Sequence, residues 1–423
     1  MDMEAVEKAL RTAVLAADAG VIAQLLEPVG VGRRDGPVRC TCGATMESRG
    51  VRAKRVQTLL GWVRFARSVY QCPKCGQTRS PGDEELDMVN TSRSPGVRRQ
   101  VARLGAKETF AQVSADMAEL AGLELCRKEA ERIAETEGGR MEQWMARERQ
   151  ELRLAGPALS ETPKTIDTLY IELDGTGIPM VPGALEGRKG KQPDGTAKTR
   201  EAKVGCVFTQ TLLNEKGRPV RDSASTSFVA SIESVDPFGW RLYDEAVRRG
   251  LFQAKRVVVL GDGAEWVKNT AQNHFPRAQF IIDYYHASEH AGELSRALLD
   301  RNPEMAESCR GRWTDYLWDG RIETLIEEAT ALLPKDQSAK KDARTQIGYF
   351  KKNAAHMRYR DYREQHLFIG SGVVETACRH LVGSRLKQSG MEWTVTGANN
   401  ILALRSVVLS GRMEDYWEQR ASA

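Results

Sequence analysis

The chain has 423 residues, which is enough for several domains and at least one sizeable hydrophobic core. Its 41% hydrophobic and 28% charged residues are ordinary for a globular protein, and a net charge of +5 identifies no partner by itself. No run of about 18 apolar residues occurs, so we expect no membrane span, and Met1-Asp2-Met3-Glu4 lacks a signal-peptide pattern. We therefore expect a cytoplasmic protein whose eight cysteines do not form a disulfide framework.

The first element expected is an amphipathic helix, because apolar residues recur at helical spacing over residues 3–26. We assign residues 1–30 to this helix. It is expected to pack on the following domain or on a second subunit.

Two close cysteine pairs follow, Cys40-Thr41-Cys42 and Cys72-Pro73-Lys74-Cys75. The β-forming residues between them, from Val56 to Val69, predict a hairpin. Four thiolates in this arrangement suit a structural Zn²⁺ with no open coordination position, whereas a redox role would favour a single C-x-x-C pair. The sequence therefore predicts a zinc ribbon over residues 31–82 that depends on its metal to fold.

The predicted ribbon is also the most basic part of the chain. From Arg33 to Arg79 there are eleven Lys and Arg residues against two acidic residues, a charge of +9. Such a charge suits a phosphate backbone, and we expect Arg52, Lys54 and Arg55 to contact DNA. A solvated surface or a purely structural ribbon would carry the same charges.

Residues 81–95 have the composition of a linker, and residues 96–157 form the next predicted domain, which is helical. A helix over Phe110–Ala121, a turn at Gly122 and a second helix from Arg127 make a helix-turn-helix candidate. Arg127 and Lys128 on the second helix are expected to contact DNA. Any helical hairpin without a DNA partner has the same pattern.

From Thr165 the sequence becomes rich in β-formers. The predicted strands cover residues 168–173, 203–213, 225–231, 257–260 and 279–282, with helices before and after the fourth strand. Three adjacent strands followed by helix, strand, helix and strand is the element order of a ribonuclease H-like α/β sheet, which we assign to residues 163–290. An all-helical insertion over 291–367 and C-terminal core helices over 368–423 complete a multidomain α+β protein.

Two predicted strands end in an Asp beside a Gly, at Asp174 and Asp262, and a late helix carries Glu375. Three carboxylates at one point repel each other unless cations lie between them, and hard oxygen ligands favour Mg²⁺ or Mn²⁺. Two such ions activate a water or a 3′-hydroxyl at a phosphodiester. The simpler explanations are that both Asp residues form turns and that Glu375 interacts with the helix dipole.

These segments together resemble the DDE transposases of bacterial insertion sequences, most of all the ISKra group, which is distantly related to Mutator-like transposases. The resemblance spans roughly residues 30–410. It is carried, in chain order, by Ile171–Thr176, the loop Gly187–Arg200 leading into Gly205–Phe208, Asp262-Gly263-Ala264, Asp283–His286, Gly370–Glu375 and Trp393-Thr394.

The resemblance implies a ribonuclease H-like catalytic domain with a helical insertion before the Glu. It also implies that Asp174, Asp262 and Glu375 bind two Mg²⁺ or Mn²⁺ ions. The unit Asp283-x-x-His286 matches the D/C-x-x-H motif of related transposases, in which the His lies near the scissile phosphate. A helix cap or core residue is the alternative role of His286.

Further DNA contacts are expected on the basic loop that follows Asp174 and on the Glu375 helix. These residues are Arg188, Lys189, Lys191, Lys198, Arg200, Arg379 and Lys387. An idle solvated loop is the alternative for the first five of them.

The function expected is a transposase that binds the terminal inverted repeats of its element, cuts them and joins the 3′ ends to double-stranded target DNA. Two element ends must be held together, so a homodimer or larger homo-oligomer associated with the bacterial nucleoid is expected. The alternatives are a non-catalytic DNA-binding regulator and a structure-selective nuclease without strand transfer.

Overall fold

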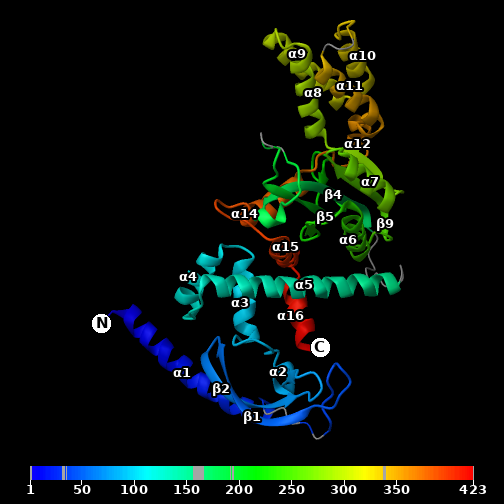
Figure 1. The fold of residues 1–423 in the computed structure, drawn as a ribbon. Coiled ribbons are helices and arrows are strands. Elements are labelled where there is room, and N and C mark those ends of the chain that lie inside the picture. Colours follow the sequence, from blue (N-terminus) through cyan, green and yellow to red (C-terminus); the bar gives the residue numbers. More distant parts are fainter. Residues whose placement is uncertain are drawn as a thin grey trace. The chain divides into compact units, whose positions relative to one another are not determined.

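The computed structural model describes residues 2–30, 34, 36–155, 166–190, 192, 195–336 and 340–422. The chain divides into two units, Met1–Glu137 and Gly138–Ala423. Each unit is described by itself below. The described residues form an α+β protein with an N-terminal helix and several separate sheets and helix groups (Figure 1).

The first unit contains a three-stranded antiparallel sheet in the order β1-β2-β3. Its strands are β1 (Glu47–Thr58), β2 (Gly61–Gln71) and β3 (Thr78–Arg79). A tight turn joins β1 to β2, with Thr58 paired to Gly61, which confirms the predicted hairpin. Along β2, Val63 and Phe65 are buried while Trp62 and Arg64 are exposed, the alternation expected of a sheet with one solvated face.

The N-terminal helix α1 (Met3–Gly30) lies against β2. Among the described residues, its stretch Met3–Leu26 is the one helix long and apolar enough to cross a membrane by length and composition. The expectation of no such segment came from a search for unbroken apolar runs. Arg11 and Asp18 interrupt the run in α1 without changing its mainly apolar composition.

Residues 81–95 are not only a linker. They include the short helix α2 (Pro81–Glu85), whose Asp83 is buried. Asp83 accepts a hydrogen bond of 2.9 Å from Lys54 Nζ, and Arg67 Nε lies 3.0 Å from its other oxygen. The linker prediction was wrong here because the pairing of Asp83 with strand residues cannot be recognised in the local composition.

Three further helices, α3 (Pro95–Gly105), α4 (Phe110–Ala121) and α5 (Arg127–Ala155), follow. The Thr109 side chain caps α4 by accepting from Gln112 N, and Gly122 ends it with a left-handed φ of 67°. The predicted helix pair is therefore present. The second helix continues to Ala155, which is further than a helix-turn-helix alone requires.

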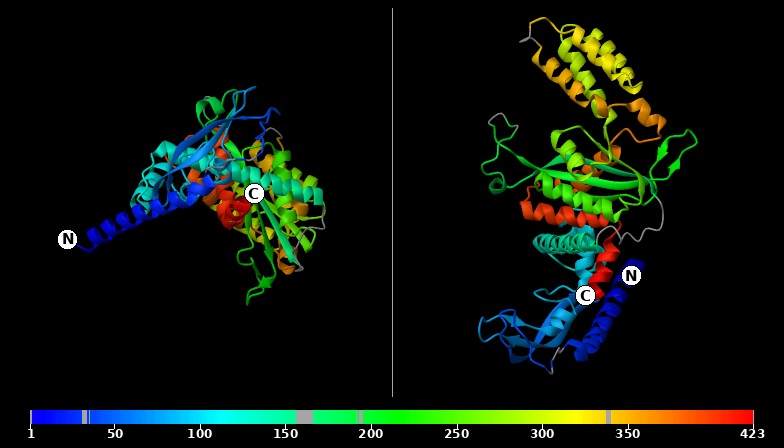
Figure 2. Two further views of the ribbon diagram at one scale, coloured as in Figure 1. Left: turned by 90° about the horizontal axis from the view of Figure 1, so that it is seen from below. Right: turned by 90° about the vertical axis from the view of Figure 1, so that its right-hand side faces the viewer.

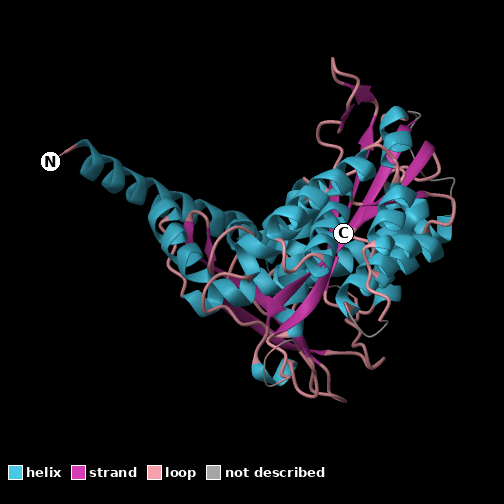
Figure 3. Ribbon diagram, turned by 90° about the horizontal axis from the view of Figure 1, so that it is seen from above, coloured by secondary structure: helices cyan, strands magenta, loops and turns pink. Residues whose placement is uncertain are grey.

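The second unit is built on a five-stranded sheet in the order β10-β9-β4-β5-β8. Its strands are β4 (Ile166–Pro179), β5 (Thr199–Gln210), β8 (Ser227–Ser231), β9 (Ala254–Gly261) and β10 (Gln279–Ile282). β4, β5 and β8 pair antiparallel, whereas β9 and β10 run parallel to β4. The five predicted strands are all present, and the helices that flank them are distinguished by colour in Figure 3. A two-stranded ribbon, β6 (Leu212–Leu213) with β7 (Pro219–Val220), lies between β5 and β8 in the chain.

The sequence predicted that the strand ends at residue 173, directly before Asp174, but β4 continues to Pro179. Gly175 pairs with Lys203 and Gly177 pairs with Glu201. A Cβ atom on Gly175 would lie 2.6 Å from the Glu201 carboxylate, and one on Gly177 would lie 2.8 Å from the Thr199 hydroxyl. The glycines therefore allow close approach of the neighbouring strand rather than a turn.

The two faces of β4 have different roles because successive side chains of a strand point to opposite sides. Leu169, Ile171 and Leu173 lie in a buried core with residues of α6 (Val235–Arg248) and α7 (Glu265–His274). Tyr170, Glu172 and Asp174 lie on the other face. There Tyr170 packs on Phe368, and the carboxylates meet the C-terminal helices.

After β10 the chain is helical, as predicted. The helices are α8 (Tyr284–Leu298), α9 (Pro303–Trp318), α10 (Ile322–Ala331), α11 (Lys341–Asn353) and α12 (Tyr359–Glu364). Figures 1 and 2 show α8 to α11, in yellow to orange, projecting from the sheet.

The chain then returns to the sheet. Helix α13 (Gly372–Ala377) continues through a π-helical turn (Cys378–Gly383) into α14 (Ser384–Leu386). α15 (Val395–Leu409) and α16 (Met413–Ser422) follow, within the range where the sequence predicted C-terminal helices. Tyr416 and Trp417 are buried, so this last segment packs through its aromatic residues.

Candidate functional site

The four paired cysteines of the first unit come together in space. The Sγ atoms of Cys40, Cys42, Cys72 and Cys75 all lie within 4.8 Å of one another. Cys40 and Cys75 are 3.5 Å apart, as are Cys42 and Cys72, far longer than a disulfide bond of about 2.05 Å. Four sulfurs around one Zn²⁺ at about 2.3 Å would be separated by roughly 3.8 Å. The cluster can therefore hold a zinc ion with little adjustment.

Two tight turns create this cluster. Cys40 O accepts from Gly43 N at 2.9 Å, and Cys72 O accepts from Gly76 N at 3.0 Å. Both glycines have a left-handed φ, 85° and 74°, which explains a Gly after each cysteine pair. Backbone N–H groups, first that of Cys75, lower the pKa of the Cys72 thiol to about 6 and so favour the thiolate that zinc requires.

The basic residues of this unit are not equivalent. Arg52 is exposed, and the exposed Arg55 lies over the Trp62 ring at 4.3 Å. The Lys54 side chain is only 10% exposed, because it pairs with Asp83. Lys54 therefore has a structural partner that the sequence did not reveal. On α5, Arg127 and Lys128 are both exposed, and Lys128 has Glu131 at 3.7 Å.

In the second unit, the carboxylates gather at one edge of the sheet. Asp174 lies on β4, Asp262 follows β9 directly, and Asp283 follows β10 directly. Since these three strands are parallel, their carboxyl ends meet at the same edge. Asp174 and Asp262 therefore lie at the same edge of the sheet.

Asp174 is half-buried, and its surroundings perturb it. Burial is the main cause that raises its pKa, and the neighbouring Asp262 carboxylate raises it further. Gly175 N donates to Asp174 Oδ1 at 2.6 Å, and Cys378 Sγ lies 3.4 Å from Oδ2. Two carboxylates that repel each other in this way would be stabilised by a cation between them.

Asp283 has a structural role. Its buried carboxylate caps α8 by accepting from His286 N at 2.8 Å, and its other oxygen accepts from Ser371 N and, at 2.5 Å, from the Ser371 hydroxyl. His286, in the first turn of α8, is half-buried, and its electrostatic effect reaches Asp174. The Asp of the Asp-x-x-His unit thus fixes the backbone at the start of α8, and the His286 ring contacts His290, with the two Nε2 atoms 3.2 Å apart.

Glu375 lies on α13 and is exposed. Its Oε1 is 3.4 Å from the Ser371 hydroxyl, and it acts electrostatically on Cys378, the residue that contacts Asp174. The π-helical turn that follows α13 carries Cys378 and Arg379; such turns are frequent at functional sites. Arg379 is exposed, and the exposed Lys387 donates a hydrogen bond to the Thr176 hydroxyl of β4.

The three predicted metal ligands therefore reach the same edge of the sheet without closing into a tight cage. Among the described residues, the cysteine cluster is the one group of three or more possible ligands whose atoms all lie within 4.8 Å of one another. Asp174, Asp262 and Glu375 do not form such a group. Their oxygen donors are the type that Mg²⁺ and Mn²⁺ take, so the donor chemistry fits these ions.

Sequence reasoning missed Glu172, two residues before Asp174 on the same face of β4. Its side chain is fully buried and accepts a hydrogen bond of 2.8 Å from Val374 N, at the start of the Glu375 helix. Burial, together with the charges of Asp283 and Glu375, raises the pKa of Glu172 to about 8. The signal available in the sequence was a Glu inside an apolar strand. A Glu at such a position is buried, and a buried Glu needs a hydrogen-bond partner.

The basic loop between β4 and β5 lies at the tip of their hairpin, with Lys189 bridged to Thr196. Arg188, Lys189 and Lys198 are exposed, and Arg200 is half-buried. Lys191 lies outside the described residues. The exposed cations offer a charged surface at the tip of this hairpin.

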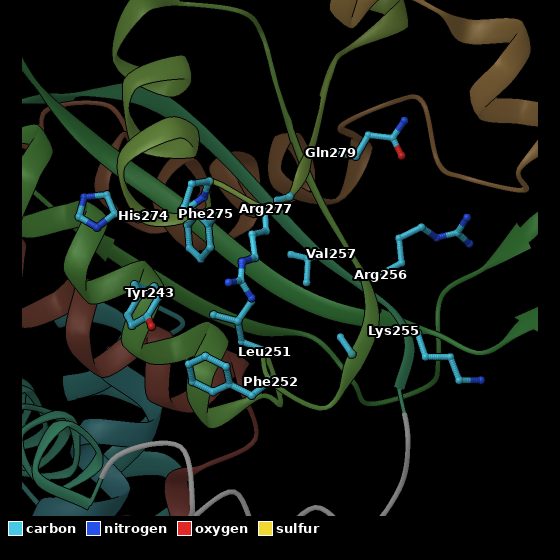
Figure 4. Close-up of a pocket in the computed structure, with 13 residues that line it drawn as sticks. Tyr243, Leu251, Phe252, Lys255, Arg256, Val257, His274, Phe275, Arg277 and Gln279 are labelled. Atoms are coloured by element: carbon cyan, nitrogen blue, oxygen red, sulfur yellow. The ribbon is translucent and has the colours of Figure 1, made fainter.

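A cavity of about 840 Å³ lies at the opposite ends of β9 and β10 from Asp262 and Asp283 (Figure 4). Leu251, Phe252 and Phe275 line it together with Lys255, Arg256 and Arg277. None of the carboxylates described above contributes to it, so this cavity is separate from the candidate site.

Residues 239–420 match an uncharacterised protein family, UPF0236; this range includes Asp262, His286 and Glu375 but not Asp174. No curated protein matches the chain. Among solved structures, the chain is similar to a Drosophila P element transposase strand transfer complex, with 8% identity, a TM-score of 0.26 and coverage of 80% of this chain and 83% of that chain. A TM-score this low does not establish a shared fold.

Proposed function

We propose that the protein is a DDE-type DNA transposase that binds the terminal inverted repeats of an insertion sequence, cuts them and transfers the 3′ ends to target DNA. The observation that supports this most is the position of the acids. Asp174 lies on the central strand of a sheet with three antiparallel and two parallel strands, Asp262 follows the adjacent strand, and Glu375 lies on a helix packed against β4 and β5. This is the arrangement expected of a ribonuclease H-like catalytic domain.

In this proposal Asp174, Asp262 and Glu375 hold two Mg²⁺ or Mn²⁺ ions. When bound, such ions lower the pKa of an attacking water or 3′-hydroxyl and stabilise the leaving oxygen. The chain itself positions the acids, Asp174 from the strand and Glu375 from a helix whose first turn is fixed by Glu172 and Asp283. In the same proposal, His286 would contact a phosphate oxygen of the bound DNA, as the resemblance to related transposases implies.

The DNA-binding parts of the proposal are the zinc ribbon, the α4–α5 pair and the β4–β5 loop. Arg52, Arg55, Arg127 and Lys128 would contact element ends, and the exposed loop cations would contact the phosphate backbone near the acids. The proposed state is a homo-oligomer in the bacterial cytoplasm, because two element ends must be held for coordinated transfer. Lys54 is left out of the proposed contacts because of its pairing with Asp83.

The test is a cleavage and joining assay on a plasmid that carries the genomic DNA flanking the coding sequence, with Mg²⁺ and mapping of every cut strand. Asp174→Asn keeps the side-chain shape and should abolish both cleavage and joining while DNA binding persists. Asp167→Asn is the matched control, because Asp167 lies on the same strand at the opposite end and pairs with Lys255 at the surface. Cleavage without joining would support the nuclease alternative, and binding without cleavage by the unaltered protein would support the regulator.

A further inference from the structure

Two histidines on α8 lie close enough to share one ion. His286 and His290 are four residues apart on the same face of the helix, and their Nε2 atoms are 3.2 Å apart. A transition metal bound by both rings at about 2.05 Å would have an N–metal–N angle of roughly 100° at this separation. That angle lies between the octahedral and the tetrahedral values, so both rings can bind one ion with small movements.

The outer surroundings of His290 are arranged as in metal sites. Its Nδ1 lies 2.7 Å from Gln346 Oε1, and Gln346 Nε2 donates to Glu293 Oε2 at 2.8 Å. Because the carboxylate can only accept from the amide nitrogen, the amide oxygen must face His290 and accept from Nδ1–H. This leaves the Nε2 lone pair of His290 directed at His286, which is the tautomer that a metal ligand requires.

The ring of His290 is also held in place. It stacks on Tyr349 with the ring centroids 4.0 Å apart, and the Tyr349 hydroxyl lies 3.4 Å from the backbone carbonyl oxygen of Asp262. Helix α11 thus supplies both Gln346 and Tyr349 to fix a residue of α8. Gln346 therefore fixes the tautomer of His290 and Tyr349 fixes its ring plane, so the ring is oriented as a ligand would be.

We propose that His286 and His290 form a transition-metal site, with the ligand class of Ni²⁺, Co²⁺, Cu²⁺ or Zn²⁺, next to the carboxylate edge of the sheet. Two imidazoles at positions i and i+4 of a helix are a known ligand pair for such ions, whereas Mg²⁺ does not select imidazole. Water or a substrate oxygen would complete the coordination. The site shares His286 with the proposed transposase activity, but Ni²⁺ binding needs neither DNA nor the carboxylate ligands and is therefore tested separately.

The test is a Ni²⁺ titration of the full, untagged chain by calorimetry, with its cysteine cluster first loaded with zinc and the zinc content checked afterwards. We expect one Ni²⁺ per chain beyond the zinc, and no comparable binding of Mg²⁺. Both His290→Ala and His286→Ala should weaken Ni²⁺ binding by more than 10-fold. Gln346→Ala should weaken it by about 10-fold, as loss of an outer partner does.

The matched controls are His366→Ala and His380→Ala, since both residues are exposed histidines of the same unit outside α8. Their Ni²⁺ affinity should equal that of the unaltered protein. Circular dichroism checks that each variant is folded; if His290→Ala is not, His286→Ala and Gln346→Ala still decide the matter. Ni²⁺ binding that survives both α8 substitutions, or the absence of any Ni²⁺ beyond the zinc, would overturn the proposal.

Discussion

The pairing of Asp83 with Lys54 and Arg67 leads to a prediction that separates structural from DNA-binding cations. The Lys54 and Asp83 side chains are 10% and 9% exposed, and burial lowers the pKa of Lys54 while Asp83 acts against that change. Asp83→Asn leaves the largely buried Lys54 and the half-buried Arg67 without a carboxylate, which costs about 3–5 kcal/mol. Lys54→Met leaves Asp83 paired with Arg67 and loses one charged hydrogen bond, which costs about 1.5–3 kcal/mol.

These free energies are large enough to measure by heating. A unit of about 137 residues loses roughly 3 °C in melting temperature for each kcal/mol. Asp83→Asn should therefore lower the melting temperature of the first unit by about 9–15 °C, and Lys54→Met by about 5–9 °C. Release of zinc during heating, followed with a coloured chelator, reports on this unit alone because it contains the cysteine cluster. The double variant should lose less than the sum of the two single losses, because the two residues interact directly.

The companion measurement is the salt dependence of binding to a DNA duplex. Arg52→Gln removes an exposed cation from the same strand and should reduce the slope of log K against log salt by about 0.9 for one lost phosphate contact. Lys54→Met should leave that slope unchanged. The reasoning is refuted if Lys54→Met leaves zinc release unchanged but reduces the slope as Arg52→Gln does.

Three further predictions concern metal, packing and pH. Cys72→Ser should abolish stoichiometric zinc binding and cooperative melting of the first unit, because structural zinc contributes about 10–16 kcal/mol; a zinc content still near one per chain would contradict this. Gly138→Ala should lower the free energy of unfolding of the second unit, measured by urea denaturation, by more than about 2 kcal/mol, because its Cβ would lie 2.0 Å from Asn400 O. Gly348→Ala, whose Cβ would lie in open space within α11, should instead raise that free energy by about 0.5–1 kcal/mol. Burial lowers the pKa of His274 from 6.5, so the contribution of the neutral His274 ring to the stability of the fold is complete above pH 6.5 and is lost as the pH falls through the folded-state pKa. The melting temperature of His274→Gln between pH 7.5 and 5 should therefore depend less on pH than that of the unaltered chain.

The strands of the second unit could be predicted because their signal is local. Val257–Leu260 and Gln279–Ile282 belong to strands that run parallel inside the sheet, and such strands form nearly continuous apolar runs. The position of Asp262 at the carboxyl edge follows from the same rule. The strand end predicted at residue 173 was wrong, because a glycine that permits a turn looks the same in sequence as one that permits close approach of Glu201.

The remaining parts of the site depend on contacts between distant residues, which no local pattern contains. Lys54 and Arg52 belong to the same basic cluster in the sequence, but only Lys54 meets Asp83. His290 has no motif of its own beyond its spacing from His286, and Gln346 lies 56 residues further along the chain. Neither the hydrogen bonds around His290 nor the role of Lys54 could have been predicted without the folded arrangement.

Two buried acids beside the candidate site, Glu172 and Asp283, explain how Glu375 is positioned. Glu172 and Asp283 are buried and accept hydrogen bonds from backbone N–H groups of Val374 and Ser371, which lie directly before Glu375 in the chain. Burying a carboxylate is costly even with such bonds, and burial raises the pKa of Glu172 to about 8, so an apolar residue of similar size would stabilise the sheet more. We infer that this free-energy cost is retained because the buried carboxylates hold the first turn of α13 at a fixed place beside β4. Asp174 lies two residues from Glu172 on that strand, so the same two hydrogen-bonded acids set the position of Glu375 relative to Asp174, which is the geometry that a shared pair of metal ions would require.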